Sequence, residues 1–108
     1  MVELAPAEFE QKAAEAAQFL RSLAHEARLM VLCQLTEDER TAGSLQKSSG
    51  LSQSALSQHL ARLREDGLVA TRREAQTIYY RLADPKAARV LQVLAEIYCP
   101  PKRKGKKQ

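Results

Sequence analysis

Residues 51–69 read LSQSALSQHLARLREDGLV, and they contain the start, the buried face and the end of one helix. Ser52 is a favourable N-cap, and the leucines at the N′ and N4 positions can form a hydrophobic staple. Gly67 predicts a left-handed cap at the C-terminal end. Leucines at helical spacing predict the buried face, namely Leu56, Leu60 and Leu63. The stretch therefore predicts a helix over Gln53–Asp66.

The opposite face of this helix is rich in hydroxyl and amide side chains near its N-terminus. Serine is a mediocre helix former, so the repeated serines suggest a use beyond folding. Hydroxyls and amides at a helix N-terminus can reach base edges and phosphates in the DNA major groove, and glutamine can pair with adenine. We therefore expect DNA contacts from Gln53, Ser54, Ser57, Gln58, His59 and Arg62. For His59, which borders the leucine face, a phosphate contact and local packing are equally open.

Three helices are expected before this one. Apolar residues recur at helical spacing between Phe9 and Leu23 and predict an amphipathic helix. A second helix is expected over about residues 25–36, with Leu29, Leu32, Cys33 and Thr36 on one stripe. TEDERT, residues 36–41, reads as a polar connection to a short helix over about residues 42–48. Residues 48–50 then read as a tight turn.

Alternating residues after the main helix predict two β-strands. Val69 and Thr71 alternate with polar neighbours, as do the apolar residues within 78–82. RREAQ between them predicts a β-hairpin with a rather long loop. We expect Arg72 and Arg73 in this loop to contact the minor groove beside the main helix.

A last helix is predicted with Asp84 as N-cap and Pro85 in its first position. Its apolar residues span so wide an arc that it needs two partners, the core and a second subunit. The expected fold is mainly α with a β-hairpin wing: four helices, the hairpin and a last helix form a winged helix-turn-helix. Residues 1–99 would form this DNA-binding and dimerisation domain, and residues 100–108 a basic, disordered tail, with added nonspecific DNA affinity as the alternative role of the tail.

The distribution of charge favours a polyanionic partner. The net charge is +4, and residues 41–82 carry 3 acidic and 6 basic side chains, whereas residues 1–40 are acidic overall. A basic middle segment fits a nucleic acid. No apolar run approaches the roughly 18 residues of a membrane span, and the N-terminus has no apolar signal segment. We therefore expect a cytoplasmic protein that does not bind membranes.

The stretch LSQSALSQHLARLREDGLVATRREAQTIYYRL, residues 51–82, resembles the ArsR/SmtB family of winged-helix repressors. LAHEARLMVLCQL, residues 23–35, matches the second helix of that family, and the resemblance extends from about Gln18 to Cys99. The resemblance implies a homodimer built through the first and last helices. Such a dimer would present two recognition helices to a pseudo-palindromic double-stranded operator.

Many members of that family sense metals, and this chain lacks the ligands. TAGSLQKSSG, residues 41–50, has none of the cysteines found at this position in the family, and PKAARVLQVLAEIYC, residues 85–99, has no histidine. We therefore expect neither a metal site nor a cofactor. The two cysteines, Cys33 and Cys99, are placed as in the persulfide-responsive branch of the family, the BigR, SqrR and HlyU type. That resemblance implies that linking Cys33 to Cys99 by a disulfide or polysulfide bridge releases the operator.

The surrounding sequence favours a reactive thiol at Cys99 more than at Cys33. Cys33 lies on an apolar stripe, where cysteine is a common core residue. Cys99 falls outside the apolar arc, Pro100 displaces it from helical geometry, and nearby Lys102 and Arg103 favour a thiolate. Packing alone therefore explains Cys33 better than Cys99.

Alternative functions remain open at this level. An HlyU-like virulence regulator or anti-repressor, or a general oxidant sensor, fits the same residues. A thiol redox enzyme would want a Cys-x-x-Cys pair or a nucleophile with an adjacent base, and neither is visible, so we expect no enzyme and no catalytic residue. A DNA-bending protein would bind all sequences with similar affinity.

Overall fold

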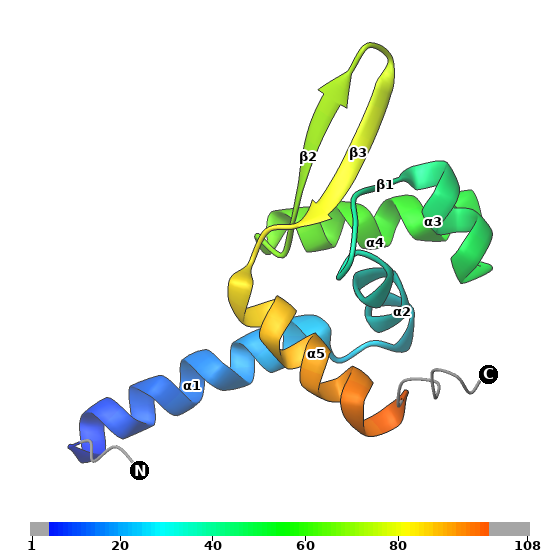
Figure 1. The fold of residues 1–108 in the computed structure, drawn as a ribbon. Coiled ribbons are helices and arrows are strands. Elements are labelled where there is room, and N and C mark those ends of the chain that lie inside the picture. Colours follow the sequence, from blue (N-terminus) through cyan, green and yellow to red (C-terminus); the bar gives the residue numbers. More distant parts are fainter. Residues whose placement is uncertain (1–4, 100–108) are drawn as a thin grey trace.

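The computed structural model describes residues 5–99, so the expected basic tail at residues 100–108 lies outside the described residues. The chain forms five helices and three strands, and the strands, which lie between the helices along the chain, form one sheet (Figure 1). Their bounds are α1 Pro6–Leu23, α2 Glu26–Gln34, β1 Arg40–Thr41, α3 Ala42–Ser49, α4 Gln53–Glu65, β2 Val69–Glu74, β3 Thr77–Leu82 and α5 Pro85–Tyr98. The predicted winged helix-turn-helix is confirmed, with one strand more than expected.

Helix α4 begins and ends as its local sequence predicts. The Ser52 hydroxyl accepts a hydrogen bond from the Ala55 backbone N–H at 3.1 Å, which is an N-cap contact of about 1 kcal/mol. Gly67 follows the helix with a φ of 75°, a conformation that glycine adopts without steric strain. Asp66 is the C-cap and not a helical residue. The predicted leucine face is buried: Leu56, Leu60 and Leu63.

The turn before α4 is shorter than predicted. Ser48 and Ser49 are the last residues of α3, and only Gly50 has the left-handed conformation, with a φ of 74°. The Ser49 hydroxyl is buried and accepts a hydrogen bond from the Leu51 N–H at 3.2 Å. The serines therefore end the helix and fix the chain that leads into α4.

The sheet has the antiparallel order β1-β3-β2. The predicted long hairpin loop is wrong, because β2 extends through Arg72 and Arg73 to Glu74, and only residues 75–76 turn. The outer part of the wing is exposed on both faces, so its strands need no alternation of apolar and polar residues. A run of polar residues there has the sequence pattern of a loop. The predicted polar connection is also partly wrong, because Arg40 pairs with Tyr80 in β1. A two-residue strand is too short to show a period.

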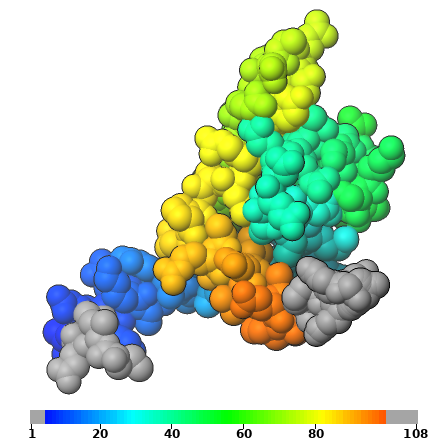
Figure 2. All heavy atoms as spheres, in the orientation of Figure 1, coloured from blue at the N-terminus to red at the C-terminus, as the bar shows by residue number. Residues whose placement is uncertain are grey.

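The core lies where α2, α3, α4 and α5 meet the base of the sheet. Its fully buried side chains include Leu32, Leu45, Leu63, Leu68 and Leu91. The wing and α1 extend away from this core in different directions (Figures 1 and 2). No helix within residues 5–99 is both long and apolar enough to cross a membrane.

Two helices leave large apolar side chains in solvent. In α1 only Leu23 is buried, while Phe9 is 66% exposed. In α5 the inner face is buried at Leu91, while Ile97 is 61% and Tyr98 75% exposed. The wide apolar arc predicted for the last helix therefore divides into a face against the core and a face without a partner in the single chain.

Candidate nucleic-acid interface and cysteine pair

The N-terminal half of α4 presents a polar, exposed surface opposite its buried leucines. Gln53, Ser54, Ser57 and Gln58 are all exposed. The Ser52 cap fixes the start of the helix, and the buried leucines fix its rotation, so these four side chains point away from the core. This surface has the hydroxyl and amide groups that read base edges in a major groove.

His59 lies on the same helix, but its ring contacts His25, which precedes α2. His59 is half-buried, and its ring centroid is 4.8 Å from that of His25, whose Nδ1 caps α2 by accepting from the Ala27 N–H at 3.1 Å. Burial lowers the pKa of His59, and the nearby charges of His25 and Arg28 lower it further. A histidine held neutral in this way favours the packing role over the phosphate contact.

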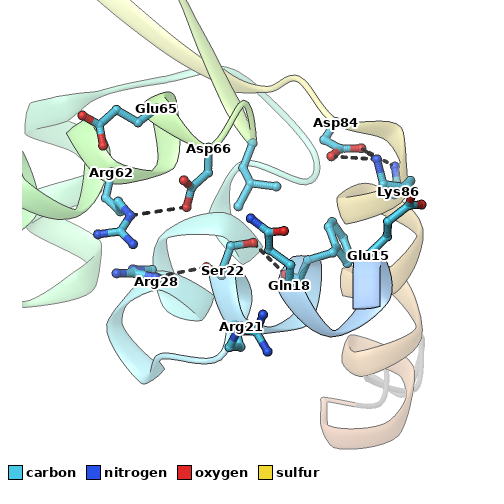
Figure 3. Close-up of a pocket in the computed structure, with 12 residues that line it drawn as sticks. Glu15, Gln18, Arg21, Ser22, Arg28, Arg62, Glu65, Asp66, Asp84 and Lys86 are labelled. Atoms are coloured by element: carbon cyan, nitrogen blue, oxygen red, sulfur yellow. Dashed lines mark hydrogen bonds and ion pairs between the residues drawn. The ribbon is translucent and has the colours of Figure 1, made fainter. Parts of the chain in front are cut away.

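Arg62 lies at the side of the polar surface rather than on it. Its Nε is 3.6 Å from Oδ2 of Asp66, one turn further along the chain. Figure 3 shows this ion pair. Both residues line a groove of about 730 Å³ that α4 shares with α1, α2 and α5. Arg28 lines the same groove and donates to the Ser22 carbonyl at 3.3 Å. A phosphate contact by Arg62 therefore competes with Asp66.

The two wing arginines differ in their surroundings. Both are exposed strand residues of β2 and not loop residues. Arg73 donates from Nε to the Ala75 carbonyl at 3.2 Å at the wing tip. Arg72 is bonded to the carboxylates of Glu39 and Glu74. Glu39 is a residue that sequence reasoning missed, because its partner lies 33 positions away and no local pattern marks such a pair.

The two cysteines are both exposed free thiols. The expectation that Cys33 belongs to the core is wrong, because the buried residues of α2 are Ala27, Val31 and Leu32. Cys99 is the C-cap of α5, with a φ of −130° outside the helical range, as its position predicted. Pro100, Lys102 and Arg103, on which the expected reactivity of Cys99 depends, lie outside the described residues.

The pKa of Cys33 is raised, first by burial of the thiolate among neighbouring atoms and then by the negative charge of Cys99. Cys33 lies near the C-terminal end of α2 and Cys99 caps the C-terminal end of α5, and these two helices pack against each other. A raised pKa keeps Cys33 protonated near neutral pH, which lowers its thiolate fraction and slows its attack on an electrophile.

This pKa leads to a prediction for the rate of alkylation. The rate at Cys33 should rise with pH and reach its midpoint above the value of a free thiol. In the variant Cys99→Ser the midpoint should move down, because the negative charge of Cys99 no longer raises the pKa of Cys33. It should stay above the value of a free thiol, because the burial of Cys33 remains. Iodoacetamide labelling across pH, with peptide mapping by mass spectrometry, measures both. Identical midpoints in the two proteins would show that the charge of Cys99 does not act on the Cys33 thiol.

The described residues also bear on metal binding. Within residues 5–99, no group of three or more histidine, cysteine, aspartate or glutamate side chains is placed to hold a metal ion.

Comparison with known proteins identifies the fold and its class of function. The bacterial regulatory protein arsR family matches residues 25–71. The transcriptional activator HlyU of Vibrio cholerae is 47% identical over 92 residues, covering 85% of either chain. This chain belongs to the ArsR family. It is therefore a DNA-binding transcriptional regulator and not an enzyme.

Two further ArsR-family relatives show the extent of the similarity. The biofilm growth-associated repressor of Agrobacterium fabrum is 49% identical over 85% of this chain and 79% of its own. The structure of the transcriptional repressor BigR from Xylella fastidiosa superposes with a TM-score of 0.80 at 42% identity, covering 89% of this chain and 98% of that one. The expected resemblance to this part of the family is confirmed.

Proposed function

We propose that this protein is a homodimeric repressor that releases its operator when reactive sulfur species link Cys33 to Cys99. The observation that carries the proposal is the placement of two exposed, free thiols at the C-terminal ends of α2 and α5, two helices that pack against each other. The link would join α2, which packs against α4, to α5, a helix of the expected dimer interface.

The chemistry requires two successive thiol exchanges. The Cys99 thiolate attacks the outer sulfur of a persulfide such as glutathione persulfide, the S–S bond breaks, and glutathione thiolate leaves. Cys99 now carries a persulfide. The Cys33 thiolate attacks its inner sulfur, and hydrosulfide leaves as the disulfide forms. The raised pKa of Cys33 favours this order, because it slows Cys33 as the first nucleophile.

The operator contacts are assigned to the polar surface of α4 and to the wing. Gln53, Ser54, Ser57 and Gln58 would enter the major groove, Arg62 would lie near phosphates, and Arg73 of the wing would reach the adjacent minor groove. His59 stays a weaker candidate. A dimer formed through the exposed apolar faces of α1 and α5 would set the spacing of the two α4 helices on a pseudo-palindromic site. A cytoplasmic location would supply the reducing conditions that keep both thiols free.

A second candidate function is an anti-repressor, which would activate transcription, or a sensor of oxidants other than persulfides. HlyU is named as an activator and BigR as a repressor, and both are similar to this chain. An anti-repressor would bind the same kind of site and act by displacing another protein. A general oxidant sensor would respond to peroxide through a sulfenic acid rather than a persulfide.

The test uses the reduced full chain and an operator selected from random-sequence DNA. The protein is treated in parallel with glutathione persulfide, hydrogen peroxide and glutathione disulfide, and intact mass and operator affinity are recorded. We expect persulfide to remove two hydrogen atoms, or to leave one added sulfur in a longer bridge, and to weaken binding. Release by peroxide alone would favour the oxidant sensor. Unchanged affinity after every treatment would refute thiol sensing.

A further inference from the structure

Arg72 is held by the fold rather than free at the wing surface. Its Nε lies 2.8 Å from Oε2 of Glu39, and its Nη2 lies 2.9 Å from Oε1 of the same carboxylate. Its Nη1 donates to Oε1 of Glu74 at 3.1 Å, and the guanidinium carbon lies 4.5 Å from the centroid of the Tyr79 ring. A two-point arginine–carboxylate pair fixes orientation, which a single exposed ion pair does not.

The pair joins the two outer strands of the sheet, which are not neighbours in the strand order. Glu39 directly precedes β1, Arg72 belongs to β2, and β3 lies between these strands. Arg72 stands opposite Tyr79, and Thr41 stands opposite the same tyrosine from the other side. The Glu39–Arg72 pair therefore crosses β3 from the residue before β1 to β2. Beyond β1 the wing continues as the two strands β2 and β3 (Figure 1).

The wing beyond this point has few other supports. β1 pairs with β3 only at Tyr79 and Tyr80, so the residues from Arg73 to Ile78 pair only with each other. The direction of the tip is therefore set by contacts at its base. A two-stranded ribbon without a third strand is marginally stable and bends easily.

We propose that Arg72 is a positioning residue, which through its two-point pair with Glu39 holds the wing in the orientation from which Arg73 reaches DNA. The inference rests on the wing contact proposed above for Arg73. The hydrogen bonds from Arg72 lower the pKa of Glu39, and Glu39 in turn raises the pKa of Arg72. Both groups thus stay charged throughout the physiological pH range, and a DNA phosphate would have to displace Glu39 to gain Arg72.

The rival assignment, in which Arg72 itself binds phosphate, predicts the opposite sign for one substitution. Glu39→Gln would release the arginine and remove a negative charge near the DNA, so binding would tighten. If Arg72 positions the wing, the same substitution loosens the wing and weakens binding. Glu74→Gln is the matched control, because it makes the same chemical change at a carboxylate that bonds the same arginine but lies within the wing itself.

The experiment measures operator affinity and its salt dependence. The single variants are Glu39→Gln, Glu74→Gln, Arg72→Gln and Arg73→Gln. Two double variants combine Arg73→Gln with Glu39→Gln or with Arg72→Gln. We expect Arg73→Gln to weaken binding by about tenfold per wing, the lower end for a hydrogen bond to a charged group. Its salt slope should become shallower by about two in a dimer, one for each wing. Glu39→Gln and Arg72→Gln should weaken binding by similar factors, and Glu74→Gln should not.

The double variants separate positioning from general damage to the fold. Adding Arg73→Gln should have little further effect in either background, because the wing is already displaced, while the thermal unfolding midpoints stay unchanged. Tighter binding by Glu39→Gln, or a full Arg73→Gln effect in that background, would overturn the inference. If Arg73→Gln alone has no effect, the Arg73 contact is wrong, and the sign of the Glu39→Gln effect alone decides whether Arg72 positions the wing.

Discussion

Replacing Cys99 by serine is expected to leave the operator affinity of the reduced protein unchanged and to abolish its response to glutathione persulfide. The wild-type protein should lose about 5–150-fold in affinity on treatment, the usual range for a coupling between two sites. The variant retains only Cys33, whose raised pKa makes it slow to attack and which has no second thiol to complete a bridge. Fluorescence anisotropy with the selected operator measures both states.

Cys33→Ser is the matched control, because it also prevents the bridge but leaves the other thiol. This variant should gain one sulfur atom at Cys99 without losing the operator, and it should do so faster than Cys99→Ser gains one at Cys33. Intact mass follows the two rates, and a non-reducing gel excludes bridges between molecules. Operator release by either single variant would show that the two cysteines do not act as a pair.

The parts of the fold that were predicted well are those whose signals are local. Ser52, the leucine face and Gly67 lie within one stretch, and each acts on the same helix, so the start and end of α4 were predicted to within one residue. Asp84 and Pro85 likewise mark the start of α5 correctly. Caps and periodic faces depend on neighbours three or four positions away, which a sequence shows directly.

The errors concern contacts between distant positions. Strand β1 exists because Arg40 pairs with Tyr80, and Glu39 is important because it meets Arg72 on another strand. Neither pairing changes the pattern of apolar residues nearby. The arginines of the wing were placed in a loop for the same reason, because backbone pairing stabilises a strand that has no buried face.

Cys33 shows a different kind of error. The predicted stripe of Leu29, Leu32, Cys33 and Thr36 has helical spacing, but the residues of α2 that the core buries are Ala27, Val31 and Leu32, so only Leu32 of the stripe is buried. Both faces carry apolar residues, so periodicity alone does not choose between them. The choice is made by α4 and α5, which pack against this helix. The sequence could thus predict that the helix is amphipathic but not its rotation.

Introducing a charge on the outer face of α5 is expected to separate the subunits. Ile97 is 61% exposed in the single chain, so Ile97→Glu should not disturb the core, whereas in a dimer the carboxylate would be buried without a partner. Binding both halves of a pseudo-palindrome through one dimer raises affinity by roughly 10²–10⁴-fold over one half, and the variant should lose this factor. Sedimentation velocity and operator titration measure the mass and the affinity.

Gln92→Glu provides the matched control, because it places the same side chain on an exposed polar position of the same helix. It should remain dimeric and bind the operator as the wild type does. On DNA that carries one half-site, Ile97→Glu should bind as tightly as the wild type, since the surface of α4 is intact. The thermal midpoint of the wild type should rise with protein concentration and that of the variant should not, because dissociation is part of unfolding only for a dimer. A dimeric Ile97→Glu protein with full operator affinity would show that the exposed apolar face of α5 is not the subunit interface.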